Sequence, residues 1–315
     1  MANRWGSKQY VVLVPETEYG TAVTALTTTG TAMFDVTCEM KNDPIITDTK
    51  IKTGSTAPHV DEKVITGTNA TVTIKGNLCS EYDELLTAFT HDTATAFVLG
   101  ETSVAVVSYD IYAMQEIGAA EATNPYDLAV GCVCTDLKIT GEANGIVQFE
   151  STWRCKSMDR GITTAVTAEP TAYAAGTPFI FGNTTGTLAN TKTTFNSFAI
   201  NLSKTLAEDR FSYQNSLTRV AEYIVAFNGT VDFETIYDDT TAKDPTFEGN
   251  IGVQTALTNL ITLVNGAFTW AITTNGNVTS FDKADPDKGL FVAKYTVALA
   301  GDTDAAALSI VVAAV

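Results

Sequence analysis

Residues 69–75 read Asn-Ala-Thr-Val-Thr-Ile-Lys, and residues 228–234 read Asn-Gly-Thr-Val-Asp-Phe-Glu, 159 positions later. Both stretches alternate polar and apolar residues after a turn-forming pair, which predicts half-buried β-strands. A second echo starts at Gly131 and Gly289, where Cys-Val-Cys-Thr-Asp-Leu-Lys-Ile and Leu-Phe-Val-Ala-Lys-Tyr-Thr-Val follow. The spacing predicts that one unit occurs twice in the chain.

The composition favours β structure. With 315 residues, the chain has room for two domains that each bury a core. Thr, Val and Ala are abundant, and β-branched side chains suit a pleated sheet. We predict a mainly β protein with two tandem antiparallel β-sandwich or half-barrel domains, each with one α-helix. The expected order is an N-terminal arm at 1–30, a first domain at 31–156, a linker at 157–178 and a second domain at 179–315.

Further elements follow from the spacing of apolar residues. Residues 34–40 and 198–202 each predict an alternating strand, and the polar stretches after them, 41–61 and 205–219, are expected to be loops. Ser80 is predicted to start a helix by capping the N–H of Asp83. A second helix is expected over 253–264, where apolar residues recur at i, i+3, i+4, i+7, i+8 and i+11 before Asn265-Gly266.

The five cysteines are expected to be reduced. Their number is odd, and Cys132 and Cys134 share one strand face, so neither a disulfide framework nor a zinc site is predicted. The start of the chain lacks the pattern of a signal peptide. The longest apolar stretch, 305–315, is shorter than the roughly 20 residues that a helix needs to cross a bilayer. No membrane insertion is expected.

The sequence shows no sign of catalysis. His59 and His91 are the only histidines and are expected at the surface, and no phosphate-binding or nucleophile motif occurs. The acidic residues at 282, 285 and 287 form either a solvated turn or a calcium site; the turn is favoured because an EF-hand's Gly and distant Glu are missing. The formal charge of −17 argues against nucleic-acid binding. We expect no enzyme activity, no cofactor and no metal.

With these elements placed, the chain resembles the tail tube proteins of long-tailed bacteriophages, in the family where the tube domain is doubled. The passages that carry the resemblance are Pro15-Glu-Thr-Glu-Tyr-Gly-Thr21, the strand–helix unit 69–90, the hairpin 131–147 and the start of the second copy at 178–237. The resemblance implies a structural virion protein of a non-contractile tail, assembled in the host bacterial cytoplasm. Its rings would stack into a tube through which viral DNA passes without specific binding.

The resemblance also implies partners and positions. Two domains per chain would fill two of six places in a ring, which favours trimeric rings over hexamers of chains. The tape measure protein and the tail-end proteins would be further partners. Candidates for the channel wall are Thr71, Thr73, Thr230, Asp232 and Glu234, which fit an outward solvated face equally well. Candidate ring-to-ring contacts are Tyr19, Lys41, Asn42, Asp43, Arg210, Tyr213 and Arg219.

Two alternatives stay open. A tail terminator, distal tail or baseplate component would share the fold but occur in only one or a few rings. A two-domain β-sandwich adhesin or carbohydrate-binding protein belongs to a different class. The scattered positions of the three tryptophans, Trp5, Trp153 and Trp270, do not indicate the aromatic platform that such a protein would use.

Overall fold

The computed structural model of the chain describes residues 10–23, 31–34, 36–48, 63–92, 96–98, 106–114, 126–162, 176–188, 193–207, 224–236, 257–266, 268–287, 290–300 and 307–314. Strands dominate these residues, which confirms the predicted mainly β fold. None of their helices has the length and apolar character needed to cross a membrane. The elements are β1 (Tyr10–Pro15), β2 (Thr31–Phe34), β3 (Val36–Asp48), β4 (Lys63–Asn77), α1 (Glu84–Thr90), β5 (Ala96–Val98), β6 (Tyr109–Met114), β7 (Tyr126–Glu142), β8 (Gln148–Cys155), β9 (Ser157–Ile162), the short 3-10 helix η2 (Phe181–Asn183), β10 (Thr185–Thr187), β11 (Ser197–Leu206), β12 (Ile224–Ile236), β13 (Leu257–Val264), β14 (Phe268–Asp287), β15 (Leu290–Leu299) and β16 (Leu308–Ala314).

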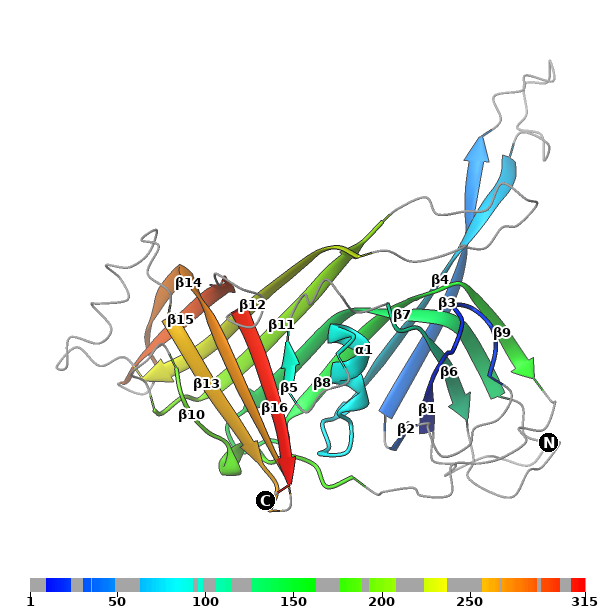
Figure 1. Ribbon diagram of the computed structural model, residues 1–315. Helices are drawn as coiled ribbons and strands as arrows, with labels where there is room; N and C mark the ends of the chain where they lie inside the picture. Colours follow the sequence, from blue (N-terminus) through cyan, green and yellow to red (C-terminus); the bar gives the residue numbers. More distant parts are fainter. Residues whose placement is uncertain are drawn as a thin grey trace.

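The strands form one antiparallel sheet, with the ribbon of β3 and β4 extending beyond its neighbours (Figure 1). The longest path through the sheet is β10-β13-β14-β15-β12-β11-β7-β6-β1-β2. Strand β7 changes neighbours along its length: it pairs with β6 and β9 near its start and with β8 and β11 near its end. Strand β14 likewise pairs with β13 and β16 near its start and with β15 near its end.

The pairing pattern contains the same unit twice. The order β3-β4-β8-β7 in the first half is repeated as β11-β12-β15-β14 in the second. A register shift occurs in both β7–β8 and β14–β15, at Thr135 and Thr279. The hydroxyl of Thr135 donates to the carbonyl of Thr152 (3.0 Å), and that of Thr279 donates to Thr296 (3.2 Å). The same bulge, with the same hydrogen bond, occurs in both halves, so the two halves are structurally equivalent.

The first sequence echo is confirmed, but the second is wrong by one strand. Stretches 69–75 and 228–234 lie in the equivalent strands β4 and β12. Gly131 lies in β7, whose counterpart is β14, whereas the residues after Gly289 form β15, the counterpart of β8. The spacing between equivalents falls along the chain, because residues 72 and 231 are 159 apart while their partners, 153 and 297, are 144 apart. A comparison of the two halves at constant spacing therefore aligns β7 with β15 instead of with its counterpart β14.

Both halves share one hydrophobic core, which includes the buried side chains of Trp153 and Trp270. Strand β1 is buried on both faces, because Val11 and Leu13 enter this core while Val12 and Val14 enter a smaller cluster on the other side. Residues of the predicted arm thus lie inside the sheet, and β9 occupies the start of the predicted linker.

Helix α1 is shorter than predicted. It begins at Glu84, and Asp83 is its N-cap residue, so the predicted start at Ser80 is wrong. The Ser80 hydroxyl donates to Glu81 Oε2 (2.6 Å). The predicted buried face is confirmed, since Leu85, Leu86 and Phe89 are at most 1% exposed.

The predicted second helix is wrong. Residues 257–264 form β13, where Leu257, Asn259, Ile261 and Leu263 are buried and the residues between them are less so. Positions four apart share a face in a helix and also in a strand, so the apolar spacing fits both structures. Pairing with β14 and β10 favours the strand. Val253 and Ala256 lie outside the described residues.

Two further expectations are corrected. The predicted loop at 41–61 begins as strand, because β3 runs to Asp48 and pairs with β4 throughout. Cys132 and Cys155 form a disulfide, so the expectation of reduced thiols is wrong for this pair. The two residues lie on β7 and β8 next to the pair Val133–Arg154, a register that the cysteine spacing does not reveal. Cys38 and Cys134 are free thiols.

Candidate functional site

One face of the central strands is polar, while the other carries the core. The strand register aligns Thr37, Lys75, Glu150, Lys138, Asn201 and Thr230 in a row across β3, β4, β8, β7, β11 and β12. All six are partly or fully exposed, whereas adjacent residues such as Ile74, Ile139 and Ile200 are buried. We call this surface the polar face.

The five candidates for the channel wall lie on the polar face, in two groups on strands that are separated by β8, β7 and β11. Thr71 and Thr73 belong to β4, and Thr230, Asp232 and Glu234 belong to β12. A second row connects the two strands, from Thr73 through Thr152, Asp136 and Ser203 to Asn228. That this face lines a channel remains a prediction.

Hydrogen bonds hold Asp232 at the centre of this surface. Asn201 Nδ2 donates to Asp232 Oδ2 (2.8 Å) and to Thr230 Oγ1 (3.2 Å). The Thr296 hydroxyl donates to Asp232 Oδ1 (2.7 Å). One carboxylate thus ties β11, β12 and β15 together.

The two repeats carry the same ion pair with the charges exchanged. Lys75 on β4 lies 2.8 Å from Glu150 on β8, and Glu234 on β12 lies 3.5 Å from Lys294 on β15. Since β12 is the counterpart of β4 and β15 that of β8, lysine and glutamate have changed places. Glu234 of the second copy is thus balanced by a lysine on the neighbouring strand.

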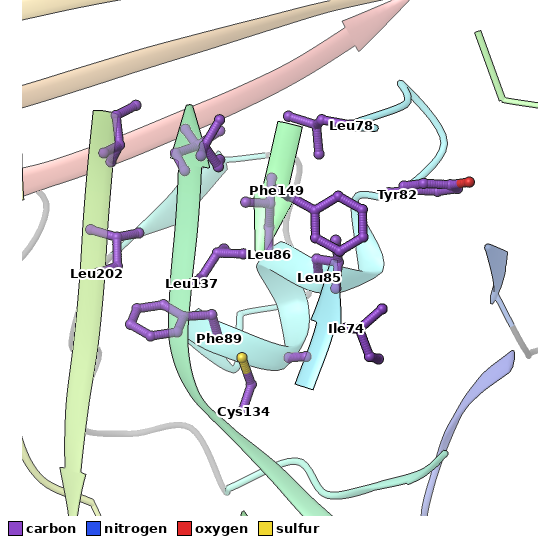
Figure 2. Close-up of a cluster of buried hydrophobic side chains, with 14 of the residues drawn as sticks. Ile74, Leu78, Tyr82, Leu85, Leu86, Phe89, Cys134, Leu137, Phe149 and Leu202 are labelled. Atoms are coloured by element: carbon purple, nitrogen blue, oxygen red, sulfur yellow. The ribbon is translucent and has the colours of Figure 1, made fainter. Parts of the chain in front are cut away.

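The repeats meet where β7 pairs with β11. On the core side, Leu137 lies opposite Leu202 and Ile139 opposite Ile200, all buried. Figure 2 shows Leu137 and Leu202 beside Phe89 of α1. On the polar face, a hollow of about 860 Å³ lies over this junction. Its polar lining includes Asp136, Lys138, Glu150, Thr152, Asn201, Ser203, Asn228 and Thr230.

Lys204 on β11 closes the C-terminal end of α1. Its side chain is buried, and Nζ donates to the carbonyls of Ala88 (3.2 Å) and Phe89 (2.9 Å). Burial lowers the pKa of Lys204 to about 7, although the nearby Cys134 and Asp136 act in the opposite direction. A lysine from the second repeat therefore satisfies carbonyls that a helix end leaves without partners.

His91 completes this contact. It adopts a left-handed conformation (φ 62°) as the C-cap residue of α1 and is buried, so its expected surface position is wrong. Val107 N–H donates to His91 Nδ1 (3.1 Å), and Nε2 lies 2.7 Å from Lys204 Nζ. Burial, helped by the charge of Lys204, lowers the pKa of His91 to about 3. A neutral ring whose Nδ1 accepts carries its proton on Nε2, the nitrogen that faces Lys204 Nζ.

The candidate ring-to-ring contacts are spread over the molecule. The Tyr19 ring lies against Lys156, whose Nζ is 5.7 Å from the ring centroid. Lys41, Asn42 and Asp43 are exposed on β3, and Lys41 forms an ion pair with Glu39 (3.0 Å). Arg210, Tyr213, Arg219 and also His59 lie outside the described residues.

The stretch that opens the family resemblance has a structural role. Glu16 Oε1 accepts from the N–H of Gly131, and Oε2 accepts from the N–H of Gly20, both at 2.7 Å. Both glycines have positive φ, which favours a residue without Cβ. The stretch is thereby fixed to β7.

Sequence analysis missed Lys204. The signal was present, since residues 198, 200, 202 and 206 are apolar and a lysine takes the inward position between them.

The acidic residues at 282, 285 and 287 lie in β14, and no group of metal-binding side chains gathers in the part of the chain that the structure describes.

Comparison with curated proteins finds no match for this chain. Its sequence fits the phage tail tube protein family over residues 6–310, nearly its whole length, and the chain therefore belongs to that family.

Proposed function

We propose that this protein is the repeating subunit of a non-contractile phage tail tube. Three chains would close a ring of six sheet units, and rings would stack to form the channel through which viral DNA passes. The units correspond to residues 31–156 and 179–315, with β1 and β9 added to the first. The tape measure protein and the tail-end proteins would be its partners, and assembly would take place in the host cytoplasm.

The β7–β11 junction carries this proposal. It shows that two equivalent units of this fold join edge to edge and keep their polar faces on one side. A unit that joins its twin in this way has a further edge for the next, since unpaired strand edges add neighbouring strands. Head-to-tail addition that closes produces a ring.

The charges of the polar face suit a channel for DNA. Lys41, Lys75 and Lys294 each form an ion pair with a glutamate. Lysines paired in this way have less capacity to neutralise phosphates, and tight binding of DNA depends on that neutralisation. The polar face therefore fits a wall past which DNA slides.

Electron microscopy of the purified protein tests the proposal. Rings or tubes with a central hole are expected at high concentration. Compact single chains under all assembly conditions, including co-expression with the tape measure protein, would contradict it.

A tail terminator, distal tail or baseplate role within the same fold predicts a different abundance. A tube subunit gives one of the strongest protein bands of purified virions. A faint band would assign the chain to a component of one or a few rings. An adhesin, in contrast, would bind glycans and form no tube.

A further inference from the structure

We propose that a neighbouring chain pairs its β3 with β14 of this chain, in the register that the chain already uses between β7 and β11. In this register Lys41 of one chain lies opposite Asp282 of the next. The inference rests on the proposed ring assembly and adds the strand edges and residues through which chains join.

Two strand edges correspond to the two sides of the internal junction. Strand β11 pairs with β12 and β7, whereas its counterpart β3 pairs with β4 alone among the described strands. Strand β7 uses Asp136–Glu142 to bind β11. The corresponding stretch of β14, 280–286, pairs with β15 on one side, and no described strand covers the other. Each edge is thus the counterpart of one that is occupied within the chain.

Equivalent residues give the register. Met40 lies opposite Val72 as Ile200 lies opposite Val231, so Lys41 corresponds to Asn201. Lys138 lies opposite Glu150 as Asp282 lies opposite Lys294, so Asp282 corresponds to Lys138. Lys138 and Asn201 are directly opposite each other at the internal junction. Transfer of this pair to the edge between chains brings Asp282 opposite Lys41.

The charges fit this register. Along one row of the polar face, Glu234, Lys294 and Asp282 alternate in sign across β12, β15 and β14. Lys41 of the next chain continues the alternation. Opposite charges on directly facing strand residues stabilise the pairing. In the free chain, Lys41 has an exposed ion pair with Glu39 on its own strand, which leaves it available for a second carboxylate.

Burial also differs between β3 and β11, beyond the stretch of β11 that pairs with β7. Ile46 is 55% exposed, whereas its counterpart Leu206 is 4% exposed. Ile65, directly opposite Ile46, is 48% exposed. Large apolar side chains that are exposed in one copy and covered in the other indicate a surface that is covered on assembly. A second copy of this chain is the occupant, because β7 of the first repeat already pairs with the corresponding edge of β11 at 197–203.

Cysteine pairs test the register. Lys41→Cys with Asp282→Cys is to be assembled in a Cys38→Ala background and oxidised, then examined on a non-reducing denaturing gel. We expect loss of the single-chain band and a ladder that ends at three chains. Lys138→Cys with Asn201→Cys is the matched internal control, and it should form its disulfide within one chain at any dilution.

A displaced pair shows whether the register is specific. Lys41→Cys with Ser280→Cys moves one partner by two residues on the same face, and we expect little cross-linking. Equal cross-linking of both pairs, or rings from the first pair without cross-links, would overturn the register. A ladder that continues to six chains would support the register and contradict the three-chain ring. Wild-type chains that form no rings would instead overturn the proposed function.

Discussion

Strands β3 and β11 occupy the same place in two copies of one fold, but among the described strands β11 has a neighbour on both sides and β3 on one side. Its inward side chains are buried, including Ile200, Leu202 and Leu206. The counterpart of Leu202 on β3 is Asn42, which is exposed, and the counterpart of Lys204 is Pro44. Over this stretch β11 carries buried residues beside a neighbour from the same chain, whereas β3 carries exposed polar residues where no described strand pairs with its outer edge.

Truncation to alanine at matched positions of β3 and β11 should give the largest difference, measured as the loss in the free energy of unfolding. Leu202→Ala removes buried apolar contacts at the junction and should lower the free energy of unfolding by about 2–5 kcal/mol. Asn42→Ala at the counterpart position should change it by about 0.5 kcal/mol or less. Urea unfolding of the unassembled chain measures both. Equal losses would show that β3 and β11 have similar surroundings.

The contact between Lys204 and α1 should make stability depend on pH. The pKa of Lys204 is about 7 when folded and 10.5 in its ordinary state. The folded chain therefore binds fewer protons between these values, and stability rises with pH across this window. The unfolding constant of the wild type should fall by up to roughly tenfold per pH unit relative to Lys204→Met. Parallel pH profiles of the two proteins would mean that the buried amine stays charged.

Reversal of one charge on β3 should affect assembly and leave the chain stable. Because the Lys41 side chain is exposed, Lys41→Asp should hardly change the thermal midpoint of the free chain. Ring formation, followed by light scattering, should weaken because two carboxylates would face each other. The second change Asp282→Lys should restore assembly. Failure of this rescue, with intact single variants, would argue against the pairing.

The exchanged ion pairs should have the smallest effect. Lys75→Ala and Lys294→Ala each remove one partly exposed pair, at equivalent places in the two repeats. Each should cost less than about 1 kcal/mol, and less still at high salt. Chemical unfolding at two salt concentrations tests this expectation. A loss above about 2 kcal/mol in one repeat alone would show that the pairs are not equivalent.

Sequence patterns predicted the class of fold and the location of β4 and β12, because alternation over several residues indicates a strand wherever it lies. They also placed the buried face of α1. The predicted second helix was wrong because 257 and 261, four residues apart, share a face in a strand as well as in a helix, and only the pairing with β14 decides between the two structures.

The polar face was predictable in part. Alternation assigns Thr71 and Thr73 to one side of a strand, and Thr230 and Asp232 to one side of another. That both pairs share a face depends on β8, β7 and β11, which lie between them in the sheet. The disulfide and the Lys204 contact depend on register and on helix position in the same way. Such long-range partners have no signature in the local sequence.

Native mass spectrometry of isolated rings tests the central claim most directly, because it counts chains without assuming symmetry. If the two repeats are equivalent wall units, the smallest closed ring contains three chains. Rings of six chains would contradict this account, since each chain would then contribute one unit to the wall instead of two.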